Sequence, residues 1–170
     1  QRPQAKFFLF GEGPLLEPLQ QQAARLGLGD RFVFGGFVKD VAAVLAAFDI
    51  SVFPSLWEGT PLTVFETMAA GKPIVATDAD GLLDVLTDER DALIVPKRDA
   101  GALAAKIVRL IDSPAERARL SANARATSAE YDIAAFVRKM ERQYDILHAR
   151  SRATGRKAIL ETDMTFLDRR

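Results

Sequence analysis

Five short apolar runs alternate with apolar residues at helical spacing along the first 95 residues of the chain. Continuous runs of this length are typical of strands that are buried on both faces, as in parallel sheets. The stripes between them predict helices, and glycine or proline stands at most of the boundaries. The expected strands are residues 7–10, 32–34, 50–53, 73–77 and 92–95, and the expected helices between them lie near residues 15–26, 41–48, 61–70 and 82–86.

This alternation of strands and helices predicts an α/β fold. Right-handed crossovers through short connections make the strands parallel and place helices on both faces of a doubly wound sheet. Three more helices are expected at residues 99–112, 114–129 and 132–148, and Ser113 and Pro114 suit the N-cap and the first position of the second. The chain is therefore expected to form a parallel sheet followed by C-terminal helices.

The composition changes near residue 150. Residues 1–149 carry the pattern of strands and helices, whereas residues 150–170 hold six basic and three acidic residues and no clear period. Within this tail, Ala158–Leu160 and Met164–Leu167 are short apolar runs. We expect one domain over residues 1–149 and a tail that is either disordered or completes the sheet with short strands.

Composition and charge narrow the chemistry. The 170 residues carry 23 basic and 23 acidic side chains, and this zero net charge gives no reason to expect a nucleic-acid partner. Cysteine is absent and His148 is the single histidine, so thiolate chemistry and a histidine metal cluster are excluded. No apolar run approaches the roughly 18 residues that a membrane span needs. Because the N-terminus shows neither an initiator Met nor a signal-peptide pattern, we expect a piece of a longer, soluble protein.

Three loops that follow expected strands hold the candidate chemistry. The first is Gly11-Glu12-Gly13-Pro14, between a strand and a helix. Glycines there allow a sharp turn and the close approach of a ligand, and the following helix N-terminus offers free N–H groups. The third glycine of the dinucleotide-binding fingerprint is missing, so an ordinary strand-to-helix turn remains the alternative.

The second loop brings two carboxylates near the end of the third strand, Glu58 in the loop and Glu66 in the helix that begins near Pro61. In an open α/β sheet, ligands bind at this end of the strands. Carboxylates accept hydrogen bonds from hydroxyl groups, so the pair suits a polyhydroxy ligand whose oxygens the N–H groups of residues 59–62 could bind. The alternative is that both glutamates are merely solvated and that Trp57 beside them is a packing residue.

The third loop, Thr77–Asp84, again lies between a strand end and a helix, with Asp80 as a candidate N-cap. On its own it is a capped turn. All three loops are expected at the same edge of one sheet, and this favours a shared ligand site over three unrelated turns.

The stretch PSLWEGTPLTVFETMAAGKPIVATDADGL resembles the donor-binding segment of the retaining nucleotide-sugar glycosyltransferases of family four, which are two-domain enzymes of the GT-B fold. Its Glu58 and Glu66 match the E-x7-E pair of that family. The stretches FGEGPLLEPL and RFVFGGFVKDVAAVLAAFDISVFPS resemble other parts of the family's second domain, in the same order. The resemblance covers about residues 6–147 and implies the Rossmann-like second domain of a GT-B fold.

The resemblance implies a role for each candidate residue. Glu66 would accept hydrogen bonds from the ribose hydroxyls of the donor, and Glu58 would contact hydroxyls of the transferred sugar. Gly81 would lie on the phosphate side, in a loop that keeps one glycine but not the proline of the family's Gly-Gly-x-Pro-Glu pattern. The other donor-binding positions are Gly11, Glu12, Gly13 and Pro14 along the nucleotide, Val38, Lys39 and Asp40 near the base, and Gly59, Thr60, Pro61 and Leu62 beside the sugar and phosphates.

The resemblance also implies the reaction. The chain would be the donor-binding domain of a retaining glycosyltransferase that moves a sugar from a nucleotide-diphosphate sugar to a sugar or lipid acceptor. Such enzymes generally need no metal or other cofactor. A front-face mechanism needs no protein nucleophile, so catalysis is positioning and stabilisation of the departing diphosphate.

Two other functions stay open at this point. The chain can be a non-catalytic sugar-nucleotide binding module that pairs with a partner chain, or a scaffold that keeps only the fold. The expected location is the cytoplasm, either free or peripheral to the inner face of a membrane. The sequence does not specify the nucleotide, the sugar, the acceptor or the linkage.

Two parts of the family's architecture have no counterpart in the chain. One is the first domain, which holds the acceptor site. The other is the first strand and helix of the second domain, which carry an Arg and a Lys for the diphosphate. We therefore expect the isolated chain to be inactive. Because the missing strand is central in the family's sheet, we also expect a gap that is filled by residues 158–167, by a second copy, or by a partner polypeptide.

Overall fold

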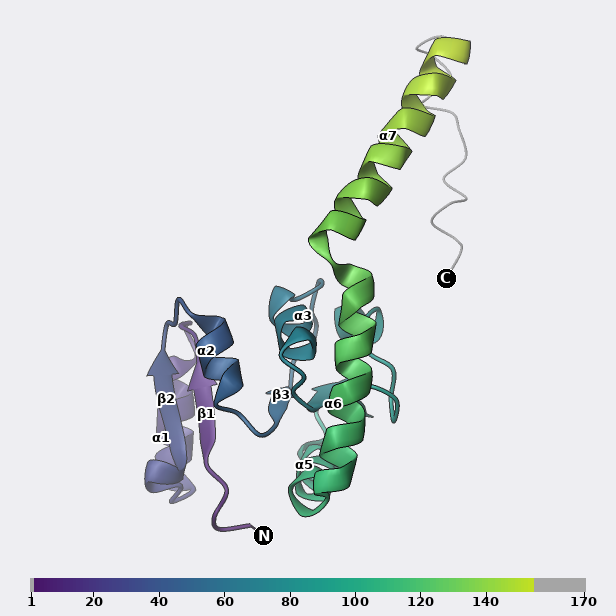
Figure 1. Cartoon of the computed structure of the whole chain (residues 1–170). Helices are drawn as coiled ribbons and strands as arrows, with labels where there is room; N and C mark the ends of the chain where they lie inside the picture. The colour runs from purple at the N-terminus through teal and green to yellow at the C-terminus, as the bar shows by residue number, and fades with distance from the viewer. Residues whose placement is uncertain (1, 155–170) are drawn as a thin grey trace. The chain divides into compact units, whose positions relative to one another are not determined.

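The computed structural model describes residues 2–154, which fall into two compact units, one ending at Ser128 and the other beginning at Ala129 (Figure 1). The first unit alternates strands and helices as the apolar pattern predicts. Its elements are β1 (Phe7–Phe10), α1 (Leu16–Arg25), β2 (Phe32–Gly36), α2 (Val41–Ala46), β3 (Ser51–Phe53), α3 (Leu62–Ala69), β4 (Ile74–Thr77), α4 (Asp80–Leu83), β5 (Leu93–Val95), α5 (Ala100–Asp112) and α6 (Pro114–Ser128), with a 3-10 turn at Gly29–Arg31.

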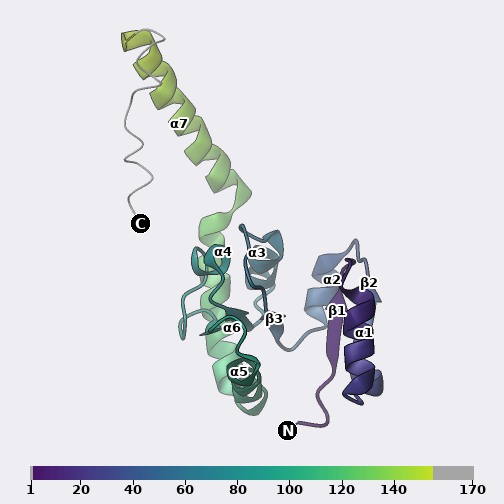
Figure 2. The same ribbon diagram turned by 180° about the vertical axis from the view of Figure 1, so that it is seen from behind.

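All five strands pair in parallel, as predicted, but they form two sheets. In one sheet β1 pairs with β2, and in the other the order is β3-β4-β5. The register places Phe7 opposite Phe32 in the first sheet, and Ser51 opposite Ile74 in the second. Within the described residues, β1 and β3 each keep one unpaired edge, and Figure 2 shows the β1–β2 pair standing apart from β3. The break falls where the missing strand of the resembling family was expected.

The prediction that β1 is buried on both faces is wrong for the described structure. Its four residues are 37–45% exposed. The cause is the unpaired edge, because a strand with a neighbour on one side only lacks the packing that a central strand receives. The rings of Phe8 and Phe10 lie 6.1 Å and 6.0 Å from the ring of Phe48, so aromatic contacts link this strand to the segment that precedes β3.

The core of the first unit is built on β4, whose four residues are all buried. Ile74 and Ala76 belong to a cluster with Val64 and Met68 of α3, whereas Val75 belongs to a second cluster that contains side chains of β5, α5 and α6. Alternate residues of a strand point to opposite faces, so the two clusters cover the two faces of β4. This strand is therefore the rigid centre from which the neighbouring loops are held.

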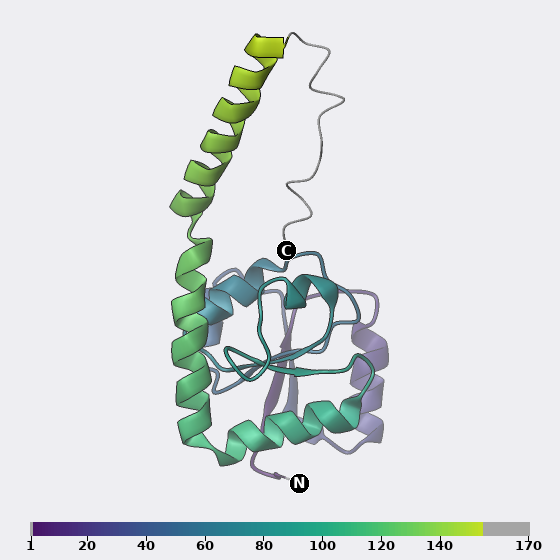
Figure 3. The ribbon, with the colours of Figure 1, turned by 90° about the vertical axis from the view of Figure 1, so that its right-hand side faces the viewer.

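Helix ends follow the predicted signals in most places. Gly27 and Gly71 have φ values of 62° and 63° and follow α1 and α3, as C-terminal glycines do. The Ser113 hydroxyl accepts a hydrogen bond from the Glu116 N–H at 3.3 Å, which confirms it as the N-cap between α5 and α6. Figure 3 shows α6 turning away from α5 at this point.

The expected cap of α4 is wrong. The N-cap residue is Ala79, whose carbonyl oxygen accepts from the N–H groups of Leu82 and Leu83, and Asp80 is the first helical residue. Ala79 is extended, and its side chain has no atom that can accept a hydrogen bond. The helix begins at Asp80, two residues before the predicted start near Leu82.

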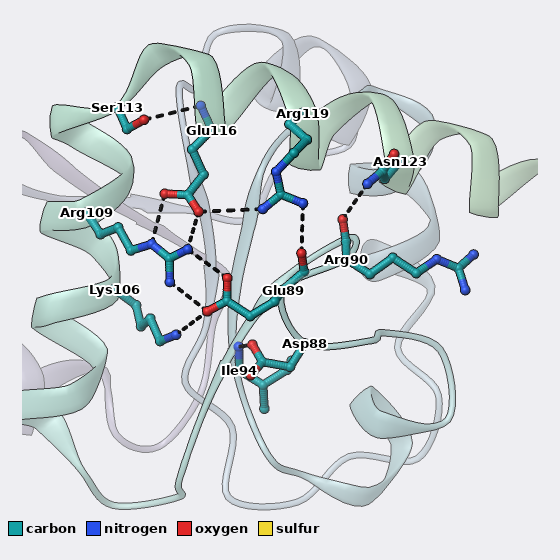
Figure 4. Close-up of polar contacts among 10 residues, drawn as sticks. All are labelled: Asp88, Glu89, Arg90, Ile94, Lys106, Arg109, Ser113, Glu116, Arg119 and Asn123. Atoms are coloured by element: carbon teal, nitrogen blue, oxygen red, sulfur yellow. Dashed lines mark hydrogen bonds and ion pairs between the residues drawn. The ribbon is translucent and has the colours of Figure 1, made fainter.

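A polar network joins the segment before β5 to α5 and α6 (Figure 4). The Glu89 carboxylate accepts hydrogen bonds from Arg109 at 2.6 Å and 2.7 Å and from Lys106 at 2.8 Å. Arg109 also pairs with Glu116, and Arg119 donates to the Glu89 carbonyl oxygen at 2.8 Å. The bonds from Arg109 and Lys106 lower the pKa of Glu89 to about 2. The network holds the end of the second sheet against its covering helices.

The second unit consists of a 3-10 turn at Ala129–Tyr131 and α7 (Ile133–Thr154). The Asp132 carboxylate accepts from the Ala135 N–H at 3.3 Å, as an N-cap does. The helix is longer than the predicted 132–148, so residues 150–154 of the expected tail are helical. The candidate strands 158–160 and 164–167 lie outside the described residues. Over the described part of the chain, no helix is both long and apolar enough to cross a membrane.

Candidate functional site

The loop after β3 holds Glu58 in a defined place. Thr77, the last residue of β4, donates its hydroxyl to the carbonyl oxygen of Ser55 at 2.5 Å. Ser55 in turn donates its own hydroxyl to Oε1 of Glu58 at 2.7 Å. Thr77 is buried, whereas Ser55 and Glu58 are half-buried. The carboxylate is therefore connected to the central strand by two consecutive hydrogen bonds.

The loop after β4 touches the same segment from another direction. Gly81 is buried in the first turn of α4, and a β-carbon added to it would lie 1.2 Å from the carbonyl oxygen of Gly59 and 2.7 Å from that of Glu58. Such distances leave no room for any side chain. The absence of a side chain at Gly81 is what allows the two loops to pack backbone against backbone.

Asp78 extends this arrangement to the next strand. Its N–H donates to the carbonyl oxygen of Val95 at 2.9 Å, and its Oδ1 accepts from the Lys97 N–H at 2.7 Å. Thr77 and Asp78 therefore fasten the loops after β3 and β5 to the carboxyl end of β4.

Glu66 lies on the second turn of α3 and is exposed. Pro61 precedes the helix in an extended conformation, and its carbonyl oxygen accepts from the Val64 N–H at 3.1 Å. Proline has no N–H, so Pro61 cannot donate to a ligand, whereas the first N–H groups of the helix have no acceptor inside it. Glu66 is therefore an exposed acceptor on α3, and Glu58 is a half-buried acceptor in the loop that precedes this helix.

The loop after β1 lines a separate hollow of about 290 Å³ at the end of the first sheet. Gly11 has a φ of 121°, which a residue with a side chain rarely adopts, and its N–H donates to the Gly36 carbonyl oxygen at 2.8 Å. The following residues, Glu12, Gly13 and Pro14, are exposed and line the hollow. The loop after β1 thus forms a concave surface at the end of the first sheet.

In the segment after β2, Asp40 caps a helix, whereas Val38 and Lys39 are at least partly exposed. The Asp40 carboxylate accepts from the Ala43 N–H at 3.0 Å and caps α2, so it has a structural task. Lys39 is exposed and Val38 is half-buried. These positions are joined to the loop after β1 through the Gly11–Gly36 hydrogen bond, whereas the loops after β3 and β4 contact each other directly.

The sequence named Glu58 and Gly81 as candidate site residues, but it did not predict the hydrogen bond from Ser55 to Glu58 or the packing of Gly81 against Gly59. Ser55 and Thr77 were part of the two candidate loops and had no role assigned. The serine three residues before Glu58 could have suggested the Ser55–Glu58 hydrogen bond. The spacing does not indicate that Thr77 of β4 holds Ser55 in turn. In residues 2–154, no three His, Asp or Glu side chains gather closely enough to hold a metal ion.

The parallel strands, the helix-covered faces and the loops at the carboxyl ends define a Rossmann-like α/β domain. A family model described as "Glycosyl transferases group 1" matches residues 1–113. The chain belongs to this glycosyltransferase family.

Relatives and solved structures agree with that membership. The chain is 43% identical over 120 residues to a lipopolysaccharide core biosynthesis glycosyltransferase, LpsD, of Rhizobium meliloti. The aligned region covers 71% of this chain and 35% of that relative. It resembles the structure of Anabaena Alr3699/HepE in complex with UDP-glucose with a TM-score of 0.80 and 27% identity, over 85% of this chain and 42% of that one. Sucrose-phosphate synthase from Thermosynechococcus elongatus gives a TM-score of 0.77 and 30% identity, over 85% and 39%.

These likenesses place the fold as that of a GT-B glycosyltransferase's Rossmann-like domain. The chain spans well under half the length of each of these three proteins, 35% to 42%.

Proposed function

We propose that this chain binds the nucleotide-diphosphate sugar of a retaining glycosyltransferase. The observation that carries the proposal is the loop before α3, in which Ser55 holds the acceptor Glu58, together with a second acceptor, Glu66, exposed on the second turn of α3. Carboxylates accept hydrogen bonds from sugar and ribose hydroxyls, and a helix start with free N–H groups suits phosphate oxygens. The family match over residues 1–113 and the likeness to a structure in complex with UDP-glucose support the same ligand class.

In this proposal, the two glutamates act on different parts of the donor. Glu66 accepts from the ribose hydroxyls, and Glu58 accepts from hydroxyls of the sugar that is transferred. The backbone at Gly59, Thr60 and Leu62 holds the sugar and phosphates, while the hollow beside Gly11 receives part of the nucleotide. The chemistry is positioning and stabilisation of the leaving diphosphate, with no protein nucleophile and no metal ion.

We further propose that additional polypeptide completes the sheet and supplies the acceptor site. The unpaired edges of β1 and β3 are suited to a parallel strand between them. Beside the first sheet, an apolar hollow of about 380 Å³ can receive a helix. It is lined by Arg2, Ala5, Phe7, Leu28, Arg31, Phe32 and the α5 residues Ala100, Leu103, Ala104, Ile107, Val108 and Ile111.

A thermal-shift panel tests the donor-binding proposal. UDP, GDP, ADP and their sugar forms are each added to the purified chain. A ligand that binds only the folded state raises its stability, by about 2.7 kcal/mol at 100 times its Kd. We expect one nucleoside diphosphate and its sugar form to raise the melting temperature and the other nucleotides to leave it unchanged. No shift with any nucleotide, either in the chain alone or in the chain joined to the additional polypeptide proposed above (the full-length protein), would contradict the proposal.

A further inference from the structure

Glu58 is held by its neighbours rather than by its own rotamer preference. Glutamate has three rotatable side-chain bonds, so an unrestrained carboxylate samples many positions. Here Oε1 accepts the Ser55 hydroxyl at 2.7 Å, and no described residue donates to Oε2. One oxygen is thus used to fix the side chain, and the other stays available to a ligand.

Ser55 can fix Glu58 only if Ser55 is itself fixed. Its carbonyl oxygen accepts the Thr77 hydroxyl at 2.5 Å, and Thr77 lies at the end of β4, which is paired on both sides and buried along its length. Because the two bonds follow one another, the position of β4 is transmitted through Ser55 to the carboxylate.

At its other end, near Gly59, the loop is held by steric contact with Gly81. The carbonyl oxygen of Gly59 occupies the space that a β-carbon of Gly81 would need. The segment from Ser55 to Gly59 is therefore fixed at both ends, by a hydrogen bond at one and by backbone contact at the other. A site that needs a carboxylate in one place benefits from such rigid support.

We propose that Ser55 and Thr77 are positioning residues that fix the Glu58 carboxylate for the transferred sugar. This inference rests on the proposed donor-binding function and deepens it. Ser55 acts through Glu58, and Thr77 acts through the Ser55 carbonyl oxygen, which is closer to its hydroxyl, at 2.5 Å, than the Phe53 carbonyl oxygen, at 3.4 Å. Losing either hydroxyl should weaken binding of the sugar nucleotide and leave binding of the bare nucleoside diphosphate unchanged, because the sugar alone contacts Glu58.

Four variants of the full-length protein test the inference. Ser55→Ala and Thr77→Val remove the hydroxyls, Thr77→Ser restores one, and Thr87→Ala is the control outside both loops. UDP, UDP-glucose, GDP and GDP-mannose are titrated by calorimetry. For the pair that binds wild type, we expect Ser55→Ala and Thr77→Val to weaken the sugar nucleotide about 10-fold, because a Glu58 side chain that is no longer fixed must be ordered when the sugar binds. Thr77→Ser and Thr87→Ala should stay within about 2-fold of wild type. Equal affinity of wild type and Ser55→Ala for the sugar nucleotide would overturn the inference.

A ligand-free measurement separates this inference from the proposed function. Three-bond NMR couplings report the rotamers of the Glu58 side chain. A single rotamer in wild type and in Thr77→Ser, with averaging in Ser55→Ala and Thr77→Val, supports the positioning role. Averaging already in wild type rejects it. If no nucleotide binds the wild type, the donor-binding proposal fails, and the couplings still decide whether Ser55 and Thr77 fix the carboxylate.

Discussion

The carbonyl oxygen of Gly59 lies 1.2 Å from the place where a β-carbon of Gly81 would stand. The two residues belong to loops after different strands, and the backbone of one fills the space beside the other. A methyl group at residue 81 must therefore displace the segment that carries Glu58.

Gly81→Ala should destabilise the fold and weaken donor binding. Overpacking against backbone costs about 1–3 kcal/mol, because the peptide group of Gly59 cannot rotate out of the way as a side chain does. Urea unfolding measures the loss of stability. Gly13→Ala is the stability control, since a β-carbon there meets nothing within 4 Å. If Gly81→Ala unfolds at the same urea concentration as wild type, the close packing of the two loops is incorrect.

The isolated chain should catalyse no sugar transfer. In our proposal the acceptor site and the cations expected on the diphosphate lie in additional polypeptide, and loss of one hydrogen-bond donor positioned at developing charge typically costs on the order of 10²–10³ in rate. A radiolabelled donor incubated with simple sugar and lipid acceptors measures this. Turnover by the purified chain, abolished in Glu66→Gln to exclude a contaminating enzyme, would show that the chain alone carries the catalytic machinery.

The unpaired edge of β1 should make the isolated chain associate. Exposed apolar strand edges pair with other chains, and a lysine on the strand opposes such pairing. We expect light scattering to show concentration-dependent oligomers of the wild type and fewer oligomers of the Phe8→Lys variant. Phe8 is 45% exposed. A monomer at every concentration for both proteins would contradict the account of the open edge.

Stability should fall in acid partly through Glu89. Its pKa in the folded chain is about 2, below the ordinary value of 4.5, because Arg109 and Lys106 donate to it. The resulting stabilisation is present above about pH 4.5 and is lost as the pH falls toward 2. Since the carboxylate is half-exposed, the effect is about 1 kcal/mol or less.

Glu89→Gln checks this assignment, because it keeps the shape of the side chain and removes its titration. Urea unfolding at several pH values should show a shallower loss of stability for the variant between pH 4.5 and 2. High salt should narrow the difference by screening the pair. Identical slopes for both proteins would remove Glu89 from the acid response. Asp112, whose pKa Arg2 lowers, titrates in both proteins and cancels in the comparison.

The local pattern predicted most elements, because helices and strands depend on neighbours in sequence. Gly27 and Gly71 mark helix ends through their own backbone preference, and the apolar run Ile74–Thr77 marks a buried strand. The exposure of β1 was missed, because a run of four apolar residues does not reveal whether a strand has neighbours on both edges.

Contacts between residues far apart in the chain could not be predicted from the sequence either. The Thr77 hydroxyl reaches a carbonyl 22 residues away, and Glu89 meets Arg109 20 residues away. Both depend on how strands and helices pack and on rotamers, which hydrophobic periodicity does not specify. Candidate residues could thus be found at strand ends, whereas the hydrogen bonds that hold Glu58 required the structure.

The most direct measurement is a calorimetric titration of Glu66→Gln and Glu58→Gln against the matching nucleoside diphosphate and sugar nucleotide, in the full-length protein. A hydrogen bond to a charged group contributes about 1.5–3 kcal/mol, so Glu66→Gln should weaken both ligands roughly 10- to 100-fold. Glu58→Gln should weaken the sugar nucleotide more than the bare diphosphate. If Glu66→Gln binds both ligands as tightly as wild type, the two glutamates are solvated surface residues and the proposed donor site is wrong.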